Sequence, residues 1–74
     1  MIVKKSYKLE NLDCANCAAK MEERIKKIEG VVSASVSFIM QKLVIEAEEK
    51  ELEKIVKQAA KICRKVDSDC RVIL

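Results

Sequence analysis

The spacing between apolar residues switches twice along this 74-residue chain, from every second residue to every third or fourth, and this pattern strongly constrains the fold. Apolar and polar residues alternate over residues 2–9, which predicts a half-buried strand. Over residues 15–29 the apolar residues recur at steps of three and four, which predicts an amphipathic helix. Its apolar positions are Ala18, Met21, Ile25 and Ile28. Gly30 follows and is expected to end the helix.

The rest of the chain repeats the pattern with two additional strands. Two strands are predicted over residues 32–38 and 43–47, and the short link between them favours a hairpin. The inward face of the first of these strands is expected to carry Val32, Ala34, Val36 and Phe38. A second helix is predicted over residues 49–65. Its apolar stripe consists of Leu52, Ile55, Val56, Ala59, Ile62, Cys63 and Val66. Asp67-Ser68-Asp69 is expected to form a turn, and a final strand is predicted over residues 70–74.

The resulting order is strand, helix, strand, strand, helix, strand. This order predicts an α+β, ferredoxin-like βαββαβ fold, in which one face of a four-stranded antiparallel sheet carries both helices. Residues 1–74 are expected to form one domain. In this arrangement the first strand lies between the third and the fourth and runs antiparallel to both. Residues 10–16 should therefore lie near residues 39–41 and near residues 66–69.

The composition excludes several functional classes. The chain has no His and one Gly, which excludes imidazole-dependent catalysis and glycine-rich phosphate loops. The net charge of +3 is too small to indicate nucleic-acid binding, and residues 42–46 carry no aromatic ring on which a base could stack. No segment approaches the roughly 20 apolar residues of a membrane span, and no signal peptide is expected. We therefore expect a cytoplasmic chain, or a cytosolic domain of a membrane transporter, whose four cysteines are thiols or metal ligands.

The segment Asp13-Cys14-Ala15-Asn16-Cys17 lies at the junction between the first strand and the first helix. Two thiols at this spacing can turn toward one point, and the unpaired amides at the start of a helix favour the thiolate form that binds metals. Cys14 and Cys17 are therefore the primary candidate metal ligands.

The identity of the ion depends on the third ligand. Two thiolates suit Cu(I), whereas Zn(II) prefers about four ligands drawn from sulfur, nitrogen and oxygen. Asp13 can supply a carboxylate oxygen, although Asp is also a favoured helix N-cap. Cys63 and Cys70 are expected to be small buried residues, with Cys63 the better candidate for an additional ligand.

Leu12 to Lys20, in its place within the predicted fold, resembles the heavy-metal-associated domains of soft-metal P-type ATPases and metallochaperones. Copper-binding members typically carry Gly-Met-Thr before the first Cys, where this chain has Asn11-Leu12-Asp13. An Asp before the first Cys is similar to the zinc-, cadmium- and lead-transporting branch. The resemblance implies that Cys14, Cys17 and Asp13 are the ligands of Zn(II), Cd(II) or Pb(II), with Cu(I) as the alternative.

The resemblance implies a non-catalytic module that transfers metal by ligand exchange, as a domain of an efflux ATPase or as a free metallochaperone. Its partners would be other domains of the ATPase or a second metal-binding domain. A monomer is expected, with a weak metal-bridged dimer as a further possibility. Two other readings compete with this one. A thiol–disulfide oxidoreductase of the thioredoxin type would also need a cis-Pro, and the chain has no Pro. A structural zinc site would use all four cysteines and would leave the metal-free chain unfolded.

Overall fold

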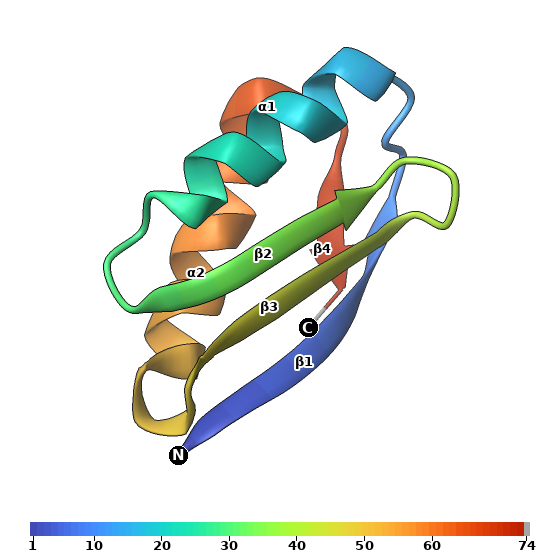
Figure 1. Ribbon diagram of the computed structural model, residues 1–74. Helices are drawn as coiled ribbons and strands as arrows, with labels where there is room; N and C mark the ends of the chain where they lie inside the picture. Colours follow the sequence, from blue (N-terminus) through green and yellow to red (C-terminus); the bar gives the residue numbers. More distant parts are fainter. Residues whose placement is uncertain (74) are drawn as a thin grey trace.

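Four strands and two helices follow one another in the predicted order in the computed structural model, which describes residues 1–73 (Figure 1). The elements are β1 (Ile2–Glu10), α1 (Ala15–Lys26), β2 (Val31–Ser37), β3 (Lys42–Glu48), α2 (Glu49–Val66) and β4 (Arg71–Ile73). Leu74, the end of the predicted last strand, lies outside the described residues. None of the helices within residues 1–73 is long and apolar enough to cross a membrane.

The strands form one sheet in the order β2-β3-β1-β4, and every neighbouring pair is antiparallel. Tyr7 pairs with Leu43 of β3, and Leu9 pairs with Val72 of β4. Both helices lie on the same face of the sheet (Figure 1). The ferredoxin-like fold predicted from the sequence is therefore confirmed.

The core lies between the sheet and the two helices. Its buried residues come from every layer, and they include Leu9, Met21, Ile25, Leu43, Ile45, Ala47, Ile55, Ala59, Cys63 and Cys70. The apolar stripes predicted for both helices face this core. Burial of these stripes is the main stabilising contribution to a helix in a protein of this size.

The predicted inward face of β2 is wrong at both ends. An irregularity in the pairing with β3 lies between Val31 and Ser33. Such a bulge changes which side chains face the core, so Val31 packs against the core while Val32 is 58% exposed. Phe38 lies beyond the last residue of the strand and is also exposed.

The first helix ends three residues earlier than predicted, at Lys26. Lys27 and Ile28 donate backbone hydrogen bonds to residues three positions earlier, which tightens the chain into a turn. Gly30 completes this turn with a φ of +96°, a conformation that favours glycine. Gly30 therefore does mark the end of the helical region, as predicted, but a turn at residues 27–29 separates it from the last residue of α1.

The end of β1 meets the segments that the topology predicted. The N–H of Leu9 donates a 2.7 Å hydrogen bond to the carbonyl of Gln41, in the link between β2 and β3. Glu10 pairs with Arg71, directly after the turn that follows α2. The segment that carries Cys14 and Cys17 therefore begins beside two other connections, the β2–β3 link and the turn between α2 and β4.

Candidate metal-binding site

The Cys loop (residues 11–17) joins β1 to the first turn of α1. Asn11 adopts a left-handed conformation, with φ +63°, which turns the chain out of the sheet. Leu12 is 2% exposed and anchors the loop to the core. The next residue, Asp13, is exposed, and Cys14 then opens the helix. A polar, metal-capable segment is thus attached to the core by one apolar side chain.

Cys14 is the N-cap of α1. Its Sγ accepts a 3.2 Å hydrogen bond from the backbone N–H of Cys17, and its carbonyl accepts the bond from Ala18 at 3.1 Å. The alternative role predicted for Asp13, as the N-cap, is therefore wrong, because the cap position falls one residue later. The Asp13 carboxylate is left exposed at the entrance to the loop.

The two thiols of the Cys loop differ in acidity. Hydrogen bonds from the side chain and backbone of Cys17 lower the pKa of Cys14. The hydrogen bond to Cys14 raises the pKa of Cys17, and partial desolvation raises it further. The arrangement therefore favours a thiolate at Cys14 while Cys17 keeps its proton.

Asp67 acts on this site from the far end of the sequence. Its negative charge opposes ionisation of both thiols and adds to the raised pKa of Cys17, whereas the hydrogen bonds from Cys17 still leave the pKa of Cys14 lowered. The same carboxylate accepts a 3.1 Å hydrogen bond from the N–H of Asp69, as expected of a turn residue. Asp67 was predicted chiefly as a turn residue, with a metal contact as the alternative, and the predicted topology already placed residues 66–69 beside the loop.

Asp13 and Cys63 do not join the two loop thiols in a preformed cluster. Within residues 1–73 there is no group of three or more His, Cys, Asp or Glu side chains arranged to hold a metal ion. Asp13 instead borders a shallow hollow, whose other lining residues are Asn11, Ser68, Asp69 and Arg71. The Asp13 side chain must therefore turn toward the thiols if it is to bind the same ion.

Cys63 and Cys70 form a second thiol pair, buried in the core. Burial, and then the neighbouring Cys70, raise the pKa of Cys63 to about 12. This environment holds the Cys63 thiol in its protonated, poorly coordinating form. The four cysteines form two separate pairs in the described part of the chain, and they are not gathered into the four-thiolate cluster that a structural zinc site would use.

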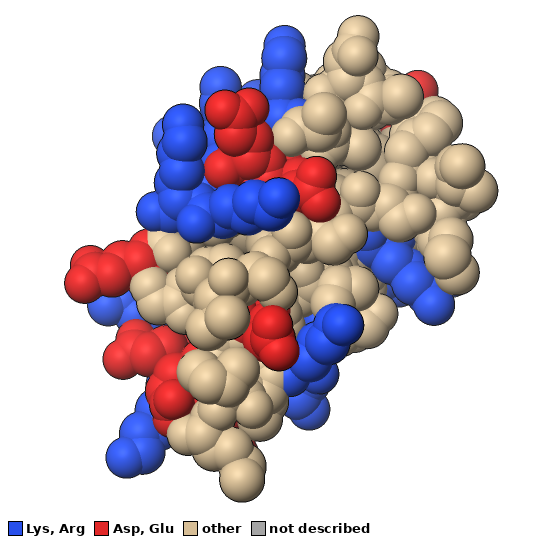
Figure 2. All heavy atoms as spheres, viewed as in Figure 1, with Lys and Arg blue, Asp and Glu red and all other residues tan. Residues whose placement is uncertain are grey.

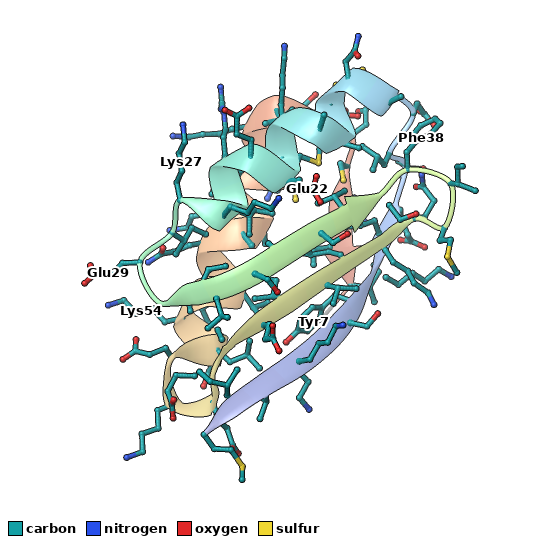
Figure 3. The ribbon with its side chains drawn as sticks, in the orientation of Figure 1. Tyr7, Glu22, Lys27, Glu29, Phe38 and Lys54 are labelled. Atoms are coloured by element: carbon teal, nitrogen blue, oxygen red, sulfur yellow. The ribbon has the colours of Figure 1, made fainter. Side chains whose placement is uncertain are left out.

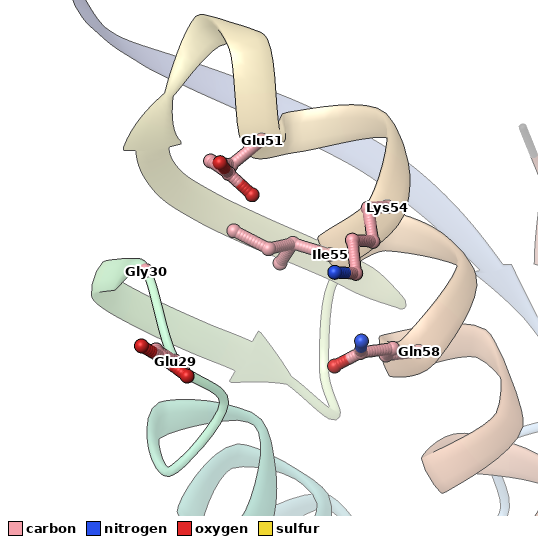
Figure 4. Close-up of a pocket in the computed structure, with 6 residues that line it drawn as sticks. All are labelled: Glu29, Gly30, Glu51, Lys54, Ile55 and Gln58. Carbon is pink, nitrogen blue, oxygen red and sulfur yellow. The ribbon is translucent and has the colours of Figure 1, made fainter.

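One face of the molecule shows how charge is distributed near the start of α1. Charged side chains gather away from the start of α1 in this view, where mostly uncharged atoms cover the surface (Figure 2). Phe38, Ile39 and Met40 are exposed in the link between β2 and β3, and Phe38 lies at the same end of the molecule as the start of α1 (Figure 3). A separate hollow at the opposite end is lined by Glu29, Gly30, Glu51, Lys54, Ile55 and Gln58 (Figure 4).

Comparison with known proteins assigns the chain to a family. Residues 6–65 match the model of the heavy-metal-associated domain. The chain is 35% identical over 66 residues to the cadmium, zinc and cobalt-transporting ATPase of Bacillus subtilis (strain 168). This match covers 89% of the chain but only 9% of the ATPase, so the chain spans a small part of that protein's length.

Two solved structures share the fold. The N-terminal domain of a potential copper-translocating P-type ATPase from Bacillus subtilis, in the Cu(I)-loaded state, has a TM-score of 0.75 and 30% identity, over 97% of this chain and 88% of that one. The CsoZ metallochaperone has a TM-score of 0.75 over the whole of both chains, and at 16% identity it supports the fold alone. Domains of this family bind metals and are not catalytic, in agreement with the prediction that this chain is not an enzyme. The chain belongs to the heavy-metal-associated domain family.

Proposed function

We propose that this domain binds a soft divalent metal ion, Zn(II), Cd(II) or Pb(II), and passes it on by ligand exchange. The observation that carries the proposal is the pairing of Cys14 and Cys17 at the start of α1, where a 3.2 Å hydrogen bond links them and the pKa of Cys14 is lowered. A thiolate that forms readily at an accessible position suits reversible binding of a soft metal.

Asp13 is the third ligand in this proposal, and it supports the choice of a divalent ion. Asp13 directly precedes Cys14 in the sequence, and its exposed side chain is free of the cap role. Two thiolates and one carboxylate leave a single net negative charge on a divalent ion and a larger one on Cu(I). Carboxylate oxygen is also a harder donor than Cu(I) prefers. The similarity to a cadmium, zinc and cobalt-transporting ATPase supports the same choice.

Transfer would proceed through an open coordination position. Three protein ligands leave room for an incoming thiolate or carboxylate, as Zn(II) favours four. The partner's ligand binds first, and one ligand of this domain then leaves, so the ion is never released to water. Because Asp13 adjoins the site and is exposed, it is the ligand best able to dissociate.

Residues 1–74 would carry out this function as one domain on the cytosolic side of a metal-efflux P-type ATPase, or as a free metallochaperone. The partner is then another domain of the ATPase or a second metal-binding domain. The mostly uncharged surface that Figure 2 shows at the start of α1 would be compatible with close approach of such a partner. We expect a monomer that forms at most a weak dimer bridged by metal.

Cu(I) is a second candidate, favoured by a specific observation. The two loop thiols lie together while Asp13 remains apart from them. Two thiolates alone suit Cu(I), and a structural neighbour that is 30% identical was solved in its Cu(I)-loaded state.

Titration of the domain with Zn(II) against a chromophoric chelator, in anaerobic reducing buffer, tests the choice between the two ions. Tight one-to-one binding is expected for the native domain, with Asp13→Ala weakening it by at least about 10-fold through loss of a ligand. Asp69→Ala is the matched control, because it removes a carboxylate that borders the same hollow. Weak Zn(II) binding that Asp13→Ala does not change would contradict the divalent proposal. A parallel titration with a Cu(I) chelator would then show binding that depends on Cys14 and Cys17 alone.

A further inference from the structure

The side chain of Gln41 forms two hydrogen bonds with the peptide groups of one residue in the Cys loop. Its Oε1 accepts a bond of 3.1 Å from the N–H of Leu12, and its Nε2 donates a bond of 2.7 Å to the carbonyl of Leu12. Both polar backbone groups of Leu12 are thus satisfied by a side chain 29 positions away in the sequence. The amide replaces the strand partner that β3 no longer offers beyond the end of β1.

Gln41 is itself held in place by its own segment. Its Nε2 also donates a 2.8 Å hydrogen bond to the carbonyl of Phe38, and its own carbonyl accepts the 2.7 Å bond from the N–H of Leu9. The residue adopts a left-handed backbone conformation, with φ +52°. Gln41 is therefore a fixed point between the end of β1 and the Cys loop, as its side chain and its backbone are both engaged.

Leu12, the residue that Gln41 holds, lies where the Cys loop leaves the sheet. Leu12 follows the left-handed turn at Asn11 and precedes Asp13, and its side chain is buried. With its side chain in the core and its peptide groups bound to Gln41, Leu12 cannot rotate freely about its backbone. The starting positions of Asp13 and Cys14 follow from this constraint.

We propose that Gln41 is a positioning residue for the metal site. It holds the Leu12 peptide groups and thereby fixes the backbone from which the side chains of Asp13 and Cys14 reach the metal ion. This inference rests on the proposed function. Without the amide, the loop would sample other conformations before binding, and the cost of ordering it would be taken from the metal affinity.

Two substitutions of Gln41 remove the contact in different ways. Gln41→Met keeps the length of the side chain and cannot hydrogen-bond to either peptide group. Gln41→Asn keeps the amide and tolerates the left-handed conformation well, but it is one methylene too short to reach Leu12 in the same way. If Gln41→Met fails to fold because the turn is strained, Gln41→Asn still tests the contact.

Gln58→Met is the matched control. Gln58 is exposed on α2 and lines the hollow shown in Figure 4. Glu29 and Lys54 of the same hollow lie at the end of the molecule away from the start of α1 (Figure 3). Gln58→Met makes the same chemical change as Gln41→Met, but at a position outside the Cys loop and its contacts. Urea unfolding of all variants establishes that each is folded under the conditions of the metal titration.

The test combines two measurements on the full chain. Amide hydrogen exchange of the metal-free protein reports on the Leu12 N–H, and the chelator competition reports on Zn(II) affinity. For Gln41→Met and Gln41→Asn we expect faster exchange at Leu12 and a Zn(II) affinity about 10-fold weaker, as for the loss of other groups that orient metal ligands. Gln58→Met should leave both unchanged.

Two outcomes would overturn the inference while the proposed function stands. Unchanged exchange at Leu12 would show that the contact does not restrain the loop. Faster exchange with a native Zn(II) affinity would show that Gln41 only stabilises the turn. If the native chain binds neither Zn(II) nor Cu(I), the proposed function fails and the positioning role fails with it, a result distinguished by the native protein alone.

Discussion

The backbone N–H of Cys17 donates a hydrogen bond of 3.2 Å to the Sγ of Cys14. This contact makes one sulfur atom both the N-cap of α1 and the thiol of the Cys loop whose pKa is lowered. The residue that begins the helix is thus also the proposed metal ligand.

The two thiols of the Cys loop should react at different pH values. The pKa of Cys14 is lowered and that of Cys17 is raised, so the Cys14 thiolate forms first as the pH increases. Because the thiolate is the nucleophile, iodoacetamide near neutral pH should alkylate Cys14 before Cys17. Peptide mass spectrometry over a pH series measures the order. Equal rates at both positions, or faster labelling of Cys17, would contradict the assignment.

Substitution of Cys14 should separate its cap role from its ligand role. Cys14→Ser provides a hydroxyl that caps a helix well, whereas Cys14→Ala provides no acceptor. Both variants should bind Zn(II) at least about 100-fold more weakly, since a first ligand is lost. Only Cys14→Ala should unfold at a lower urea concentration than the native chain. Equal stability of the two variants would show that the cap contact contributes nothing.

The buried thiols should make the protein sensitive to alkaline pH. The pKa of Cys63 rises from an ordinary 9.0 to about 12 on folding, so between these values the unfolded chain has lost a proton that the folded chain retains. The free energy of unfolding should therefore decrease as the pH rises from about 9 toward 12. Below pH 9 the buried Cys63 thiol is protonated in both states and causes no such loss of stability. Urea unfolding at a series of pH values measures this slope. Cys63→Ala should make it shallower, and an unchanged slope would assign the effect to other groups.

The metal-free domain should be folded. Its core closes through apolar side chains from both helices and the sheet, and the Cys loop is anchored by Leu12 without a metal ion. Treatment with a chelator should therefore leave the circular dichroism spectrum unchanged, unlike that of a structural zinc domain. Loss of helical signal on chelation would show that metal contributes to folding.

The centre of the sheet should be sensitive to truncation. Ile45 of β3 is fully buried, whereas Ile39 in the link to β3 is 91% exposed. Ile45→Ala should lower the free energy of unfolding by about 2–5 kcal/mol, the usual cost of deleting these methyl groups from a core. Ile39→Ala, the same change on the surface, should cost less than about 0.5 kcal/mol. Urea unfolding of both variants tests the contrast.

Most of the fold was predictable because it depends on periodic burial. The stripes on α1 and α2 and the alternation in β3 face the core as predicted. The error in β2 arose because a bulge changes the facing of side chains without leaving a sign in the sequence: Val31 and Val32 are chemically identical, and only pairing with β3 selects between them.

The candidate site was predictable in part. Cys14 and Cys17 were identified from their spacing and their place before a helix, which are local features. The cap at Cys14 in place of Asp13 depends on where the first helical turn closes, and helix boundaries shift by one or two residues with tertiary context. The contribution of Asp67 to the potential at the thiols depends on folding, which brings the end of α2 to the loop.

The sequence by itself determined the order of the elements, the position of the two thiols at a strand-to-helix junction, and which segments meet there. These properties follow from local spacing and from the restricted handedness of strand crossovers. Tertiary structure alone decided that Cys63 pairs with Cys70 in the core and that the Gln41 amide binds the Leu12 peptide groups. Both contacts join residues whose partners no local pattern specifies, since a side chain finds its partner only after the sheet and helices have packed.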